Sequence, residues 1–143
     1  MRGKLLSGGK ARTYAIVFDK GDEFVAGIKR FAEENGLDAA HFTAIGAFSR
    51  MTLEYFNRQK MAYDKIPLDQ QVEVLSLIGN IAGEEDGLKV HAHTVVGLPD
   101  GTTRGGHIGE AHVWPTLEVM LDEGSGELKR KKDPETGLTL LDI

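Results

Sequence analysis

Apolar residues along the chain fall into short runs that turn residues separate, which is typical of a protein built mainly from strands. The runs predict strands over 13–18, 41–48, 51–58, 72–81, 89–98, 102–108, 116–121, 127–131 and 138–141. Between the third and fourth of these runs, 59–70 contains Pro67 and has no clear period, so we expect an irregular segment there.

One segment follows the helical period instead. Phe24, Ile28 and Phe31 recur at a spacing that brings them to one side of a helix. We expect this helix over 23–35, with Asp22 as its N-cap. Gly36 follows directly and supplies the left-handed residue that commonly ends a helix.

Many consecutive strands after a single early helix favour an α+β fold. We expect a two-layer sandwich in which the helix covers one face of a mainly antiparallel β-sheet. The sequence contains no internal repeat, linker or low-complexity segment, and 143 residues suit one domain. We therefore interpret 1–143 as a single domain.

Composition narrows the chemistry that the chain can perform. There is no cysteine, which excludes disulfides, thiolate metal sites and cysteine nucleophiles, so a metal would need imidazole and oxygen ligands. The net charge is −5, and an acidic protein is a poor binder of nucleic acid because basic side chains that neutralise phosphates dominate that affinity. The basic run 129–132 is followed by acidic residues, and we interpret it as a solvated strand end.

Nothing in the sequence indicates a membrane protein or an exported one. No apolar run reaches the roughly 20 residues that span a bilayer, and the first residues lack the long apolar stretch of a signal peptide. We expect a cytoplasmic protein.

The five histidines carry the most specific chemical signal. His91 and His93 are two residues apart on a predicted strand, so both side chains leave the same face, about 6.5–7 Å apart along the strand. A hairpin then decides where His107 lies. A three-residue loop at 99–101 (Pro-Asp-Gly) pairs His93 with His107 on that face, whereas a two-residue loop at 100–101 turns His107 to the other face unless a bulge at 105–106 restores it.

With the three-residue loop, His91, His93 and His107 form a three-histidine metal site. Three neutral imidazoles suit Zn²⁺, with Ni²⁺, Co²⁺ or Fe²⁺ as alternatives, and they leave one coordination position open. The alternative interpretation is that these are half-buried strand histidines bonded to carbonyl groups. Strand alternation turns His112 to the opposite face, so we expect a structural or interfacial role for it. His41 has no partner nearby in sequence, and we expect a structural role.

Catalytic machinery is harder to identify. No phosphate-binding loop or serine-hydrolase elbow is present. A metal with an open position could activate water, but the general acid or base could be Glu54, Glu73 or Glu110, and the sequence does not rank them. Glu110 could instead accept a hydrogen bond from one of the metal-ligating imidazoles, or it could have only a role at the surface.

Several of these motifs together resemble a known family. The segment 72–81 (VEVLSLIGNI), His91-Ala92-His93, and 100–107 with its Gly-Gly-His ending, followed by Ala111, closely resemble the PPC ("plants and prokaryotes conserved") domain, also called DUF296 or PD1-like. The resemblance extends from about residue 14 to 138. It implies a two-layer fold with a mainly antiparallel sheet, assembly as a homotrimer, and metal binding by His91, His93 and His107.

Plant members of this family carry a separate AT-hook with an Arg-Gly-Arg-Pro core that binds DNA, and this sequence has no such core.

Three candidate functions follow from the sequence, in order of preference. The first is a homotrimeric metal-binding protein, with zinc as the expected metal and a regulatory or ligand-binding role. The second is the DNA-binding or transcription-associated function that the family's name suggests, with DNA or a protein as partner. The third is a metal-dependent hydrolase or lyase.

Overall fold

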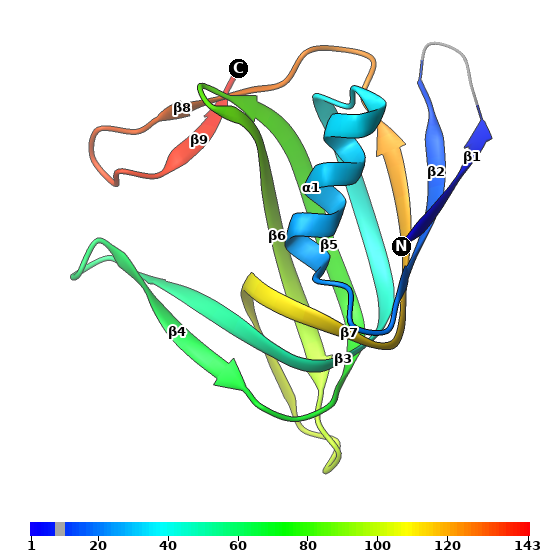
Figure 1. Ribbon diagram of the computed structural model, residues 1–143. Helices are drawn as coiled ribbons and strands as arrows, with labels where there is room; N and C mark the ends of the chain where they lie inside the picture. The colour runs from blue at the N-terminus through cyan, green and yellow to red at the C-terminus, as the bar shows by residue number, and fades with distance from the viewer. Residues whose placement is uncertain (8–10) are drawn as a thin grey trace.

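A single β-sheet dominates the computed structural model, which describes residues 1–7 and 11–143 (Figure 1). It contains nine strands and one helix: β1 Arg2–Ser7, β2 Thr13–Asp19, α1 Phe24–Asn35, β3 Ala39–Asn57, β4 Ala62–Leu68, β5 Val72–Glu84, β6 Gly87–Gly97, β7 Thr103–Glu123, β8 Lys129–Lys132 and β9 Thr139–Asp142. The pairings are antiparallel except for one parallel contact of β5 with β8. A sheet-dominated fold with one helix is thus what the apolar pattern predicts.

The helix lies where its period predicts, but the predicted cap is wrong. Glu23, and not Asp22, is the N-cap: its carboxylate accepts hydrogen bonds from two backbone N–H groups of the first turn, at 2.7 and 3.2 Å. Asp22 instead contacts the amino group of Met1 at 2.6 Å. Gly36 ends the helix in the left-handed conformation, with φ of 63°, as predicted.

Two strands are much longer than predicted. The expected strands 41–48 and 51–58 are one strand, β3, and the expected strands 102–108 and 116–121 both belong to β7. Register shifts bend β3 at several points. At one of them Gly46 has φ of 145°, and a Cβ there would lie 2.3 Å from the carbonyl oxygen of Thr116. Such bulges let a long strand change direction and pair with different neighbours along its length.

The segment predicted to be irregular contains a strand. Within 59–70, residues 62–68 form β4, which pairs with the second half of β3. Pro67 is compatible with this position because β4 pairs only with β3, and edge strands tolerate proline. β1 is a second strand that the sequence pattern does not indicate.

The four strands β3, β5, β6 and β7 pair with one another in a closed ring, so each of them has one side toward the core and one side away from it. β6 pairs with β5 on one side and with the first part of β7 on the other, and both β5 and β7 pair with β3. Strand alternation on β6 turns Ala92, Thr94 and Val96 toward the buried side and His91, His93 and Val95 away from it.

The helix packs on the buried side of the sheet (Figure 1). Phe24 of α1 packs edge-on against Phe18 and Phe42, at ring-centroid distances of 5.6 and 5.9 Å. This core leaves the opposite side, with the predicted metal ligands, open to solvent. Across residues 1–7 and 11–143, no helix is long and apolar enough to cross a membrane.

Candidate metal centre

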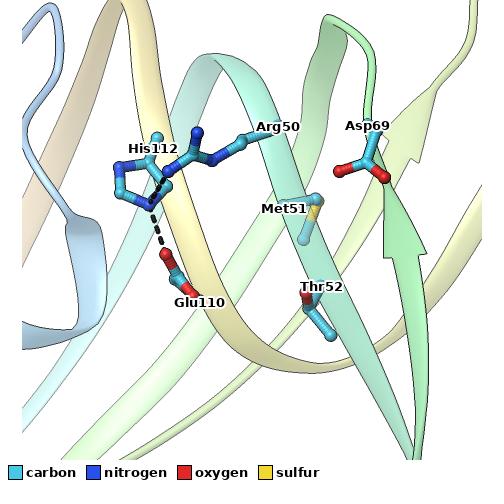
Figure 2. A pocket seen from close by; sticks show the side chains of 6 residues that line it. All are labelled: Arg50, Met51, Thr52, Asp69, Glu110 and His112. Atoms are coloured by element: carbon cyan, nitrogen blue, oxygen red, sulfur yellow. Dashed lines mark hydrogen bonds and ion pairs between the residues drawn. The ribbon is translucent and has the colours of Figure 1, made fainter.

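Two of the five histidines lie apart from the other three. His41 is exposed and lies 3.6 Å from the carboxylate of Asp122. His112 lies in a separate hollow of about 310 Å³, where its Nε2 contacts Glu110 at 2.5 Å and Arg50 at 3.2 Å (Figure 2). Neither histidine joins the cluster described below.

The predicted alternation between His107 and His112 is broken. Ile108, Ala111 and Val113 are all buried, because a register shift separates the first of them from the other two. His112 therefore lies on the exposed side of β7, as His107 does, and not on the opposite face. Glu110 binds His112 instead of one of the clustered imidazoles, so its predicted supporting role for the cluster is wrong.

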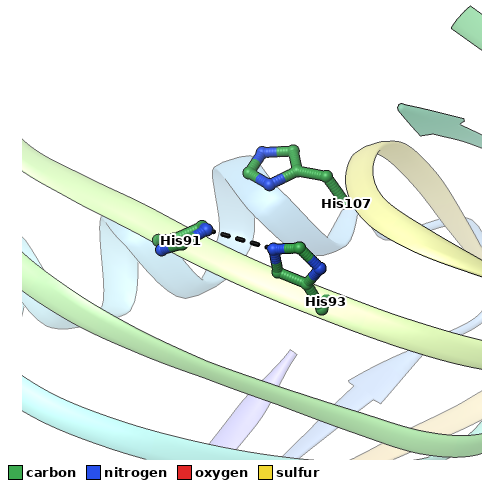
Figure 3. Close-up of side chains that lie close together, drawn as sticks. All are labelled: His91, His93 and His107. Atoms are coloured by element: carbon green, nitrogen blue, oxygen red, sulfur yellow. Dashed lines mark hydrogen bonds between the residues drawn. The ribbon is translucent and has the colours of Figure 1, made fainter. Parts of the chain in front are cut away.

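His91, His93 and His107 come together on the outer side of the sheet (Figure 3). The β6–β7 hairpin has the three-residue loop 99–101, closed by a 2.8 Å hydrogen bond from the N–H of Leu98 to the carbonyl oxygen of Thr102. His93 is consequently paired with His107, as the longer-loop register predicts. Gly105 and Gly106 lie within this regular pairing, so no bulge is needed there.

The cluster has dimensions that suit a metal ion. One ring nitrogen from each histidine lies within 4.8 Å of the other two, and the Nε2 atoms of His91 and His93 are 3.2 Å apart. Tetrahedral zinc with bonds of about 2.0–2.1 Å places its ligand atoms about 3.3 Å from one another. At 3.2 Å one neutral ring can donate its N–H to the other, or both lone pairs can turn to one ion. The donor set and the spacing therefore both fit a divalent metal.

The surroundings favour neutral imidazoles, the form that binds metals. Burial lowers the pKa of His107 to about 4, and the neighbouring His91 and His93 add to this shift. Burial also lowers the pKa of His91. The charge of Arg130, the charge that His93 carries when protonated, and the charge of Lys89 add to this shift in that order. Both rings thus keep a free lone pair at neutral pH without any metal.

A cavity of about 270 Å³ opens beside His91 and His107. Its walls contain Glu54 and Tyr63 as well, and the Tyr63 ring lies against His107 with a centroid distance of 5.1 Å. Burial, and then the charge of Glu54, raises the pKa of the Tyr63 hydroxyl. Of the three carboxylates that the sequence leaves unranked, only Glu54 lines this cavity, because it is paired with His107 across β3 and β7.

Sequence reasoning missed six residues of this cavity: Tyr63, Lys89, Arg130, Leu138, Thr139 and Leu140. Tyr63 lies in the segment that we expected to be irregular, and Arg130 lies in the basic run that we interpreted as solvated. Lys89 was detectable, since it precedes His91 by two residues on one strand and so shares its face. Glu73 pairs with Gly97 near the other end of β6 and is not part of the cavity.

We compared the chain with known protein families and with curated proteins. The sequence profile of the Plants and Prokaryotes Conserved (PCC) domain matches residues 5–125. No curated protein matches the chain.

Solved structures give further similarity. A plant- and prokaryote-conserved (PPC) protein of Pyrococcus horikoshii is 33% identical over 92% of each chain, with a TM-score of 0.87. A metal-containing protein of Archaeoglobus fulgidus is 33% identical over 100% of this chain and 99% of its own, with a TM-score of 0.86. A proposed DNA-binding protein of Bacteroides thetaiotaomicron is 27% identical over 98% and 96%, with a TM-score of 0.87.

Proposed function

We propose that this chain, which belongs to the Plants and Prokaryotes Conserved (PCC or PPC) domain family, binds a divalent metal ion through His91, His93 and His107. The single observation that carries the proposal is the convergence of three imidazole nitrogens within 4.8 Å on a rigid pair of strands. The similar archaeal protein that is described as metal-containing supports it. Zinc is the metal that we expect, because three imidazoles without thiolates suit it well.

The protein's own residues define what such a site can do. Three protein ligands leave a coordination position for water or a ligand, and the metal would supply Lewis acidity there. His91 and His107 line the cavity that Glu54 also lines, so a molecule in this cavity would lie next to two of the three ligands that would hold the metal. We propose a regulatory or ligand-binding role, in which the site recognises a small molecule.

Metal analysis of purified protein tests the proposal. Wild-type protein, stripped with a chelator and reloaded with zinc, should retain about one zinc per chain after gel filtration. His93→Ala should retain almost none, whereas the matched control His112→Ala should retain as much as wild type. Equal zinc in wild type and His93→Ala would overturn the assignment.

We also propose that the protein assembles as a homotrimer and that its two-layer architecture leaves the outer side of the sheet for assembly. Five apolar side chains, each between 43% and 60% exposed, make up what we call the outer apolar surface: Ile45, Leu75, Ile78, Val95 and Met120. Isolated exposed apolar residues are ordinary, but a group on neighbouring strands is typical of an interface. Ile78 is paired with His93, so this surface borders the histidine cluster.

DNA association is the second candidate, and the proposed DNA-binding protein of Bacteroides thetaiotaomicron favours it. The net charge of −5 weighs against it. Fluorescence anisotropy with a labelled duplex at several salt concentrations separates the two. Affinity that falls steeply with salt would support DNA binding, and no affinity near physiological salt would exclude it.

A further inference from the structure

The cavity beside the histidine cluster contains a positive charge that makes no direct ion pair with a described carboxylate. Arg130 of β8 is half-buried, and its terminal nitrogens donate to two neutral groups, the side-chain carbonyl of Asn80 at 2.6 Å and the backbone carbonyl of Thr139 at 2.9 Å. Its Nε is buried and has no hydrogen-bond partner. Within 1–7 and 11–143, no carboxylate lies within ion-pair distance of this guanidinium.

A fixed guanidinium without a direct ion pair is unfavourable for the free protein. Burial lowers the pKa of Arg130, and the charge of Glu84, which lies outside ion-pair distance, offsets only part of this effect. The two neutral partners fix the orientation of the group but do not neutralise it. An anion that enters the cavity would recover part of this cost, since a half-buried charge interacts more strongly with a counter-charge than a solvated one does.

Lys89 adds a second cation to the same wall. It lines the cavity two residues before His91 and makes no ion pair within the described part of the chain. Lys89 lines the same cavity as His91 and His107, so its ammonium group lies on the wall that the two imidazoles also form. Glu54 supplies one negative charge against the two cations, which leaves the cavity positive even before a metal is counted.

The remaining wall is apolar. Leu138, just before β9, and Leu140, within β9, line the cavity together with Tyr63. The volume of about 270 Å³ is near the lower end of small-molecule sites. A free inorganic anion would leave the leucines unused, whereas an organic acid would use both the cations and the apolar wall.

We propose that this cavity binds a small organic carboxylate, with its carboxylate group toward the histidine cluster, Lys89 and Arg130, and its apolar part against Leu138 and Leu140. The inference rests on the proposed metal site and names the class of ligand that the site recognises. Recognition combines the open position of the metal with the guanidinium of Arg130, which two hydrogen bonds hold in place, and with the exposed ammonium group of Lys89.

Isothermal titration calorimetry on zinc-loaded protein tests this, with butyrate as the probe. Neutral butyramide tests the requirement for charge, and inorganic phosphate tests the requirement for an organic acid. Butyrate should bind, and butyramide should not. Arg130→Gln should weaken butyrate about tenfold, an effect of the size expected for one partly desolvated charge contact, and Lys89→Gln, which removes a more exposed charge, should weaken it by a smaller factor. The control Lys131→Gln removes an exposed charge outside the cavity and should change nothing.

Zinc content, measured in parallel on each sample, separates the two proposals. Full zinc with no butyrate binding, or with equal binding by wild type and Lys89→Gln, would overturn the carboxylate site and leave the metal site intact. Phosphate binding more tightly than butyrate would also overturn it. Failure of wild-type protein to take up zinc would overturn both proposals together.

Discussion

His93 and His107 are direct partners across β6 and β7, although fourteen positions separate them in the chain. The three-residue loop 99–101 sets this register, and a shift of one residue would turn His107 to the other face of the sheet. The positions of two candidate metal ligands therefore depend on the geometry of a turn that contacts neither of them. His91, two residues along β6, completes the cluster.

Metal binding should stabilise the fold measurably. A ligand that binds only the folded state stabilises it by about 4 kcal/mol at roughly 1,000 times its Kd. For a chain of this size we expect zinc to raise the Tm of wild-type protein by about 10 °C. Differential scanning fluorimetry with and without a chelator measures this shift. His107→Ala should show no zinc-dependent shift, and a shift equal to that of wild type would contradict the role of His107.

Gly79→Ala should destabilise the protein by about 2–3 kcal/mol, the range for overpacking a tight core site. A Cβ at Gly79 would lie 2.4 Å from Cζ of Phe42 and 2.7 Å from the backbone oxygen of His91, so β3 or β6 would have to move. Urea denaturation monitors the free energy of unfolding. Gly126→Ala is the matched control, because a Cβ there meets nothing within 4 Å. Equal stability of the two variants would show that the strands yield without cost.

Glu123→Gln should weaken the connection between the start of β2 and the end of β7. Arg12 binds both carboxylate oxygens of Glu123, at 2.6 and 2.7 Å, and donates to the carbonyl oxygen of Asn35 at the end of α1. The side chains of Arg12 and Glu123 are 29% and 17% exposed, so solvent screens part of the interaction. At pH 7 we expect a loss of about 1–2 kcal/mol, typical of a charge-assisted bidentate pair.

The effect of Glu123 should depend on pH with a defined sign. The hydrogen bonds from Arg12 hold the pKa of Glu123 below its ordinary value of 4.5 in the folded protein. The unfolded chain therefore binds more protons between the two pKa values, and stability rises with pH in that window. The stabilisation is complete above pH 4.5 and is lost as pH falls through the folded pKa. Urea denaturation at pH 7 and pH 3 should show wild type and Glu123→Gln converging at the lower pH; a constant difference would contradict this.

Ile45→Lys should disrupt the proposed trimer. Ile45 is 60% exposed on the outer apolar surface, and a lysine there would carry a charge into the interface. Multi-angle light scattering should give a trimer mass for wild type and a smaller mass for the variant. The control Tyr55→Lys changes an apolar residue that is 67% exposed elsewhere on β3 and should stay trimeric. A monomeric wild type would rule out the assembly.

The sequence predicted those features that local periodicity and turn chemistry control. The helix, its stop at Gly36 and the register of His93 with His107 are all set by neighbouring residues, and the structure has all three. The convergence of His91 with that pair follows from alternation along one strand. Metal binding, the identity of the metal, the trimer and the two-layer description stay predictions.

Features that depend on distant parts of the chain could not be predicted this way. Glu23 is selected as the N-cap partly because its carboxylate also accepts from the backbone N–H of Ala111 in β7, a contact that no local pattern reveals. β3 continues through its bulges because β7 and β5 supply partners on both sides. Arg130 reaches the cavity only because the β8–β9 hairpin folds back beside Asn80.

The alternation of inward and outward side chains along β6 has a consequence for the evolution of such a protein. Ala92, Thr94 and Val96 are buried in the core. His91 and His93 alternate with them along the strand and are not part of the core. Substitution at the outward positions can therefore alter, weaken or remove the ligand set while the fold is maintained. Alternate residues of β6 thus serve two separate purposes: one set packs the core, and the other set forms the candidate metal site.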